Sequence, residues 1–177
     1  MPEKMTLEEV NRLGRDEFVA RLGPVFESSP WVAEGAWRSR PFGSFAELHG
    51  AMDRVVSEAS MERQMALIRA HPDLAGNAAV AGELTSESTG EQASAGLDRL
   101  TPGEYEAFTE INRAYRQRFG FPMIVCVREH TKESILQNAG SRLENSREKE
   151  VETALGEIAK IARLRLQDLV EQEGGRR

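Results

Sequence analysis

The chain has 177 residues, the size of one ordinary domain, and we expect a single domain over 1–177 with flexible ends at 1–5 and 172–177. Its formal net charge is -6, with 29 acidic and 23 basic residues interspersed, which argues against nucleic acid or an anionic membrane as a partner. The single cysteine, Cys126, excludes an internal disulfide framework, and no apolar run suits a signal peptide or a membrane span, so we expect a cytoplasmic protein.

Helix start signals recur along the chain, where a serine or threonine precedes a glutamate by three residues and the two can form a capping box. Four pairs have this spacing: Thr6 with Glu9, Ser44 with Glu47, Ser88 with Glu91, and Thr101 with Glu104. Between them apolar residues recur every three or four positions, as in Leu48, Met52, Val55 and Val56. The pattern predicts a series of helices.

The first candidate for a chemical role is His71, in the stretch RAHPDLAG from Arg69 to Gly76. A proline disfavours helical backbone in the residue before it, so Pro72 predicts that the preceding apolar helix ends there. A histidine at a helix end can simply hydrogen-bond the last carbonyls, and taken alone this structural role is the expected one. His49 and His130 lie in charged surroundings and look more ordinary still.

The stretch from Gly76 to Gly96 has weak helical periodicity and predicts a loop around a short helix. Within it Glu91 follows Ser88 by three residues, so its plain role is a helix cap. The same helix start would present unbonded amides and the positive end of the helix dipole, which suit an anionic or carbonyl-rich ligand. Gln92 adds an amide that both donates and accepts hydrogen bonds.

The only strand-like run is FGFPMIVCV, from Phe119 to Val127. No second alternating run exists to pair with it, and an isolated strand is not stable, so we expect a buried extended or short helical link.

A long helix is predicted at the C-terminal end of the chain. One face of it is apolar and consists of Val151, Leu155, Ile158, Ile161, Ala162, Leu166 and Leu169. Arg163 and Arg165 are about 200° apart on this helix, and Arg165 lies nearer the apolar face. A guanidinium there needs an anionic partner, which can be a structural carboxylate or a substrate carboxylate.

Five stretches in this order resemble the 2-oxo-4-hydroxy-4-carboxy-5-ureidoimidazoline (OHCU) decarboxylases of uric acid degradation. They are HPDLAG at 71–76, ES..EQ at 87–92, AGLDRL at 95–100, FGFPMIVCV at 119–127 and EIAKIARLRLQDL at 157–169. The resemblance spans nearly the whole chain. It implies an all-α, single-domain multi-helix bundle and a cofactor-free homodimeric enzyme that converts OHCU to (S)-allantoin and CO2. Urate oxidase and 5-hydroxyisourate hydrolase would be its upstream pathway neighbours.

The same resemblance assigns roles to particular residues. It implies that His71, Glu91 and Arg165 are catalytic. It implies that the substrate contacts Pro72, Ser88, Gln92 and the backbone of Met123, Ile124, Val125, Cys126 and Val127. Met123 stands where the family often has phenylalanine, a swap that changes the shape of the pocket but not the chemistry. Pro72 would then direct His71 into a pocket.

The proposed substrate can accept the electrons of decarboxylation into its own C=N group, so neither pyridoxal nor metal is required. We expect Arg165 to orient the substrate carboxylate and His71 to donate a proton. Glu91 either polarises the 4-hydroxyl or sets the orientation and charge of the histidine. The alternative is a non-catalytic helical ligand-binding or regulatory module with the same fold. A metal-dependent hydrolase is a weaker alternative, because the chain lacks a suitable ligand cluster.

Overall fold

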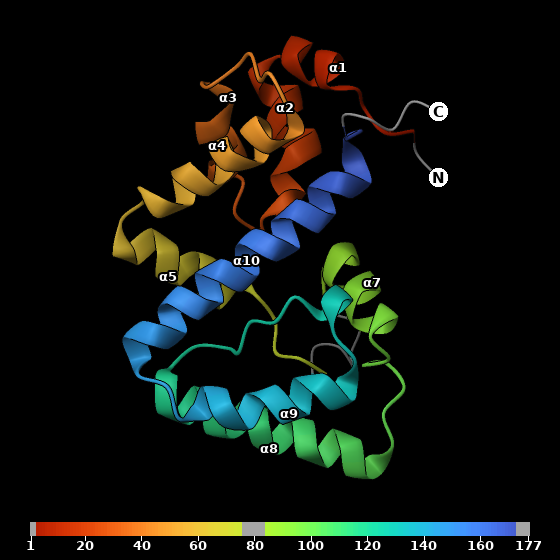
Figure 1. The fold of residues 1–177 in the computed structure, drawn as a ribbon, viewed down its shortest axis with the longest axis vertical. Helices are drawn as coiled ribbons and strands as arrows, with labels where there is room; N and C mark the ends of the chain where they lie inside the picture. Colours follow the sequence, from red (N-terminus) through yellow and green to blue (C-terminus); the bar gives the residue numbers. More distant parts are fainter. Residues whose placement is uncertain (1–2, 76–83, 173–177) are drawn as a thin grey trace. The chain divides into compact units, whose positions relative to one another are not determined.

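The computed structural model describes residues 3–75 and 84–172, and the regular elements within these ranges are helical, which confirms the all-α prediction (Figure 1). In chain order they are α1 (Leu7–Arg12), α2 (Arg15–Leu22), the 3-10 helix η1 (Gly23–Val25), α3 (Trp31–Trp37), α4 (Phe45–Ser57), α5 (Met61–Ala70), α7 (Ser86–Ser94), α8 (Pro102–Phe119), the 3-10 helix η2 (Val127–Glu129), α9 (Lys132–Leu143) and α10 (Arg147–Leu169). None of the described helices is long and apolar enough to cross a membrane.

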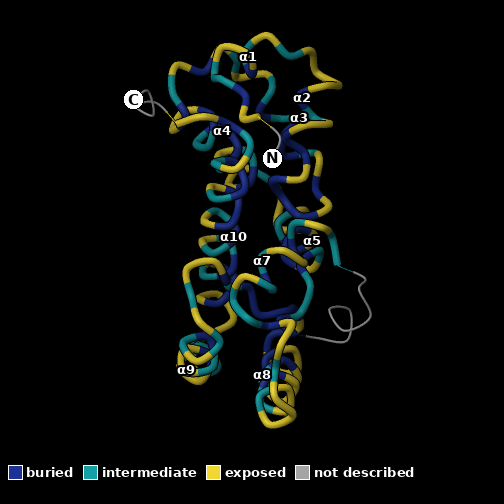
Figure 2. The backbone as a smooth tube through the Cα atoms, turned by 90° about the vertical axis from the view of Figure 1, so that its right-hand side faces the viewer, coloured by how far each residue is buried: buried dark blue, intermediate teal, exposed yellow. Residues whose placement is uncertain are grey.

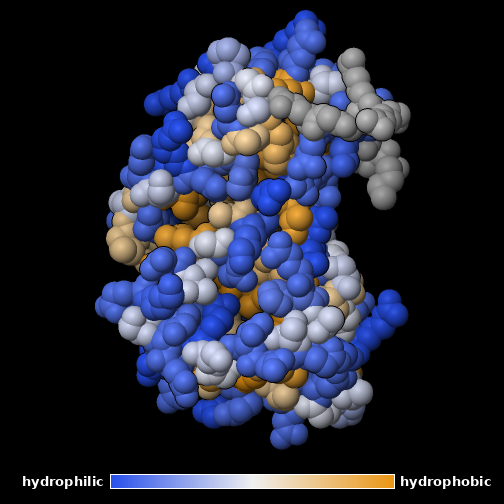
Figure 3. Space-filling view, in the orientation of Figure 1, coloured by the Kyte–Doolittle hydropathy of each residue, from blue (hydrophilic) through white to orange (hydrophobic). Residues whose placement is uncertain are grey.

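The chain forms two compact units. The first comprises Met1–Ala70 and Ala159–Arg177, and the second comprises His71–Ile158. Each helix carries buried residues on one side and exposed residues on the other (Figure 2). Hydrophilic residues make up most of the surface that is visible in Figure 3, in keeping with the high charge content of the sequence.

In the first unit, local caps and apolar faces form as the sequence predicts. Thr6 and Glu9 form a reciprocal capping box at α1, and the Ser44 side chain accepts a hydrogen bond from the Glu47 amide at α4. Helix α3 packs against α2 and α4. The core includes Phe18, Leu22, Val32, Leu48, Met52 and Leu166, all without exposed surface. Met5, in the segment expected to be flexible, pairs with Val170 through a parallel bridge; residues 1–2 and 173–177 lie outside the described residues.

The second unit is built on α8, which packs against α9. Thr101 and Glu104 form the predicted capping box at the start of α8. The helix ends at Phe119, and its C-cap Gly120 has a φ of +80°, the left-handed conformation that glycine adopts readily. Beyond it the chain runs extended and enters η2, which confirms the predicted link. The aromatic rings of Tyr115, Phe119 and Phe121 pack together and are buried.

Candidate active site

His71 is the first residue after α5, which ends at Ala70, so the predicted helix end before Pro72 is confirmed. Only 6% of its surface is exposed. The two residues Leu67 and Ile68 on the last turn of α5 are fully buried. The imidazole is therefore held away from solvent at the point where the helix ends.

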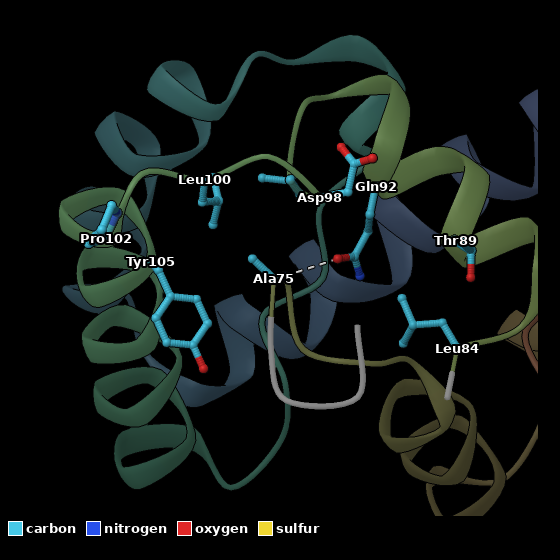
Figure 4. A pocket seen from close by; sticks show the side chains of 9 residues that line it. Ala75, Leu84, Thr89, Gln92, Asp98, Leu100, Pro102 and Tyr105 are labelled. Carbon is cyan, nitrogen blue, oxygen red and sulfur yellow. Dashed lines mark hydrogen bonds between the residues drawn. The ribbon is translucent and has the colours of Figure 1, made fainter. Parts of the chain in front are cut away.

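The chain turns sharply after Pro72, and Gln92 of α7 holds this turn together. Ala75 has a φ of +50°, a left-handed conformation that costs a non-glycine residue about 1–2 kcal/mol. Its N–H donates to Gln92 Oε1 at 3.0 Å, while Gln92 Nε2 donates to the Asp73 carbonyl at 3.2 Å. Figure 4 shows the Gln92 side chain reaching Ala75. Both ends of this buried amide are therefore engaged by the segment His71–Ala75, which we call the histidine turn.

Helix α8 supports the histidine turn from a second side. Asn112 Nδ2 donates to the Leu74 carbonyl at 2.7 Å, and Arg116 Nε donates to the Asp73 carboxylate at 2.9 Å. Asn112 is buried, and its Oδ1 has no hydrogen-bond partner within the part of the chain that the structure describes. Gln92 and Asn112 thus bond the backbone that follows His71, and Arg116 bonds the Asp73 side chain within it.

The start of α7 differs from the prediction. The helix begins at Ser86, and Thr85 is its N-cap, because the Thr85 side chain accepts from the Ser88 amide. The additional turn is stabilised by the bond from the Thr89 amide to the Thr85 carbonyl, at 2.9 Å. The predicted capping box of Ser88 with Glu91 is therefore wrong, and Glu91 lies in the middle of the helix. Glu91 therefore does not cap the start of α7, and this alternative to a chemical role is excluded.

Ser88 and Gln92 are buried on one side of α7, with Glu91 partly exposed beside them. These positions are three and four residues apart, so a helix presents them on one face. Gln92 joins α7 to the histidine turn, and α7 packs against η2, which follows the extended link. The second unit therefore brings three sequence-predicted segments together around one helix.

The extended link contributes unbonded backbone amides. Met123, Ile124, Cys126 and Val127 are buried and Val125 is partly exposed. Among residues 3–75 and 84–172, the structure records no acceptor for the N–H groups of Met123, Ile124, Val125 and Val127. Buried amides are nearly always paired in folded proteins. A run of them without acceptors can bind a carbonyl-rich or anionic ligand.

Arg165 belongs to the first unit, where it lies on the buried side of α10, whereas Arg163 is exposed. This confirms the predicted helical phasing. Its Nη2 donates to Glu27 Oε2 at 2.8 Å and its Nη1 donates to the Pro24 carbonyl at 3.1 Å. Glu27, only 3% exposed, supplies the anionic partner, and sequence reasoning missed it because it lies between η1 and α3, outside any periodic pattern. The substrate role of Arg165 stays a prediction.

A cavity of about 500 Å³ is bordered by Gln92 and by Ala75 of the histidine turn (Figure 4). Its lining is formed by Ala75, Leu84, Thr89, Gln92, Leu97, Asp98, Leu100, Pro102 and Tyr105. Of the predicted site residues, Gln92 is the one found in this lining. Within the described residues no cluster of three or more histidine, cysteine or acidic side chains could hold a metal ion.

Comparison with known proteins gives one consistent family. A protein of Halalkalicoccus jeotgali named 2-oxo-4-hydroxy-4-carboxy-5-ureidoimidazoline decarboxylase is 44% identical over 172 residues, covering 97% of this chain and 96% of that protein. A protein of the same name from Haloferax volcanii is 45% identical over 170 residues, covering 96% of this chain and 99% of that protein.

Among solved structures, an (S)-allantoin synthase matches with a TM-score of 0.76 and 29% identity. The match covers 94% of this chain and 55% of that one, so the chain spans about half of that protein. A family model described as OHCU decarboxylase matches residues 11–167. Since that model covers most of the chain and the two relatives align along nearly its whole length, the protein belongs to the OHCU decarboxylase family.

Proposed function

We propose that the protein decarboxylates OHCU to (S)-allantoin and CO2 in the degradation of uric acid. The names of the two relatives and of the solved (S)-allantoin synthase support this reaction. The structural observation that carries it is that one helix, α7, bonds the turn that follows a buried histidine and packs against η2, where the stretch with unbonded amides ends. This arrangement pairs a proton donor with donors for the substrate's carbonyls.

The proposed reaction requires no covalent bond between the protein and the substrate. As the carbon–carbon bond to the carboxylate breaks, CO2 leaves and the electron pair moves into the adjacent C=N group, whose nitrogen takes up a proton. The 4-hydroxyl then loses its proton to become the ring carbonyl, and the neighbouring carbon is protonated on one face. The protein has to orient the anion, stabilise the developing charge and deliver that proton.

The residues of the second unit suit these tasks. His71 is the proposed donor of the proton that sets the configuration, because an imidazole exchanges protons near neutral pH. Glu91 is proposed to polarise the 4-hydroxyl or to orient His71. Ser88 and the amides of 123–127 would read the ureido and ring carbonyls, next to Pro72. Gln92 is predicted to contact the substrate; because its amide bonds the histidine turn at both ends, we propose that it also holds that turn.

We further propose that the enzyme works as a homodimer in the cytoplasm, without metal or organic cofactor. Its substrate would come from urate oxidase and 5-hydroxyisourate hydrolase. Cofactor independence follows from the chemistry of OHCU, which accepts the decarboxylation electrons itself. Protein dialysed exhaustively against EDTA should keep its activity, and restoration of an inactive protein by a divalent ion would contradict this proposal.

The function is tested by generating OHCU freshly from urate with the two upstream enzymes and following allantoin by circular dichroism. Spontaneous decay should give a racemic, optically silent product, whereas the enzyme should give (S)-allantoin at an accelerated rate. A silent product formed at the spontaneous rate would favour the non-catalytic binding module.

A further inference from the structure

A buried polar network lies beneath the extended link in the second unit. Its centre is Glu150, near the start of α10, which has no exposed surface. Glu150 Oε1 accepts from the Tyr115 hydroxyl at 2.6 Å and from Arg142 Nε at 2.8 Å, and Glu150 Oε2 accepts from Asn145 Nδ2 at 2.8 Å. We call these four residues the Glu150 network. Helices α8, α9 and α10 each contribute to it.

The network ends on the backbone of the link. Arg142 uses Nε for Glu150 and Nη1 for the Ile124 carbonyl, which accepts at 2.6 Å. A guanidinium is planar, so an arginine held at one edge by a buried carboxylate presents its other donors in a fixed direction. The ion pair therefore determines where the Ile124 carbonyl points.

That carbonyl determines the direction of an amide. The Ile124 carbonyl and the Val125 N–H belong to one planar trans peptide group, in which the two bonds point to opposite sides. When Arg142 holds the carbonyl in the network, the Val125 N–H points away from the network. Val125 is the partly exposed residue of the link, and within the described ranges its N–H has no recorded acceptor.

The network also makes this amide a stronger donor. A cation at the carbonyl end of a peptide group withdraws electron density, and in a low-dielectric interior such chains of hydrogen bonds polarise one another. Tyr115 keeps its proton as a donor, since burial and the neighbouring Glu150 carboxylate raise the pKa of its hydroxyl. Glu150 thus holds the charged Arg142, and Arg142 in turn polarises the peptide group between Ile124 and Val125.

We propose that Arg142 is a positioning residue for the decarboxylation: held by Glu150, it aims the Val125 N–H at a carbonyl of the substrate. This proposal rests on the proposed function. Replacing a buried ion pair by apolar residues is often neutral for stability. Stability alone therefore does not explain why the Arg142 guanidinium bonds both a carboxylate and a backbone carbonyl.

The test compares Arg142→Lys with Tyr115→Phe. An ammonium group cannot span Glu150 and the Ile124 carbonyl together, so Arg142→Lys removes the tether but keeps a charge for Glu150. Tyr115→Phe removes a different bond to the same carboxylate, together with the long 3.5 Å bond from Arg142 Nη2 to the Tyr115 hydroxyl. It leaves the bonds of Arg142 to Glu150 and to the Ile124 carbonyl in place. Both should lower the free energy of unfolding. Only Arg142→Lys should lower kcat/KM for OHCU, by about 10- to 100-fold and mainly through KM, because a carbonyl held in ground and transition states alike acts on binding.

A second measurement keeps the proposal testable if Arg142→Lys fails to fold. In the ¹⁵N-labelled wild-type protein, the Val125 amide resonance should shift on titration with (S)-allantoin. The shift should saturate at the same concentration of (S)-allantoin as the inhibition of turnover by this product. Tyr115→Phe should show the same shift, and Arg142→Lys should need more (S)-allantoin to reach it.

The outcomes separate this proposal from the function on which it rests. A wild-type protein that forms (S)-allantoin, with a Val125 amide that does not respond to it, overturns the positioning role and leaves the function standing. So does an Arg142→Lys variant whose KM equals that of Tyr115→Phe. A wild-type protein that does not accelerate the formation of (S)-allantoin overturns both.

Discussion

The backbone of the histidine turn should lose its conformation when Gln92 is replaced by leucine. Gln92→Leu leaves the Ala75 N–H and the Asp73 carbonyl without their partner, and leucine keeps a side chain of similar size in place. Losing a partner costs a buried backbone group about 1–3 kcal/mol, and the Asp73 carbonyl, which is only partly buried, belongs at the lower end of that range. Gln92→Leu should therefore lower the free energy of unfolding by about 2–4 kcal/mol.

The effect on turnover should exceed the effect of lost stability. Ala75 holds a left-handed conformation that persists only while its surroundings enforce it, so the turn should relax once Gln92 is gone. A displacement of the imidazole by about 1 Å can lower turnover by about 100-fold. Turnover is measured from the dichroism of allantoin, at a temperature where urea titration shows the variant to be folded.

Gln64→Leu is the matched control. Gln64 also bonds a backbone carbonyl through its amide, at 2.9 Å from Val56, but it lies on α5 in the first unit. Its loss should cost about 1 kcal/mol and leave turnover unchanged. Equal turnover of the Gln92→Leu and Gln64→Leu proteins would refute the idea that Gln92 positions His71.

Three further predictions concern single side chains. His71→Asn should keep the fold and lower turnover about 100-fold or more, and near wild-type turnover would remove His71 from the mechanism. Arg165→Lys loses the planar fork that meets Glu27 and should impair turnover measured by circular dichroism, whereas the exposed Arg163→Lys should be nearly silent; equal turnover would contradict a role for Arg165. A hydrogen bond from Lys132, with the capping bond, lowers the pKa of Glu104 to about 2. Glu104 therefore stabilises the fold above its usual pKa near 4.5, so the difference in Tm between wild type and Glu104→Gln should shrink as pH falls from 4.5 toward 2, and a constant difference would contradict this.

Local sequence determined the ends and faces of most helices. Pro72 ends α5 because of a clash between neighbouring residues, and Thr101 with Glu104 begins α8 because their side chains reach each other's amides within one turn. The burial of Arg165 and the exposure of Arg163 follow from the helical period. These outcomes depend on residues a few positions apart, so the sequence alone could predict them.

Only the tertiary structure decided which of two suitable residues begins helix α7, and which residues far apart in the sequence bond each other. Thr85 and Ser88 are both good N-caps, and in the folded chain Thr85 is the cap while Ser88 is buried within the helix. Gln92 bonds the histidine turn 17 to 19 residues away, and Arg165 meets Glu27 across 138 residues. The bond of Arg142 to Ile124 spans 18 residues and joins two elements that no sequence period relates. Such pairs carry no local signal, because their geometry exists only after the helices have packed.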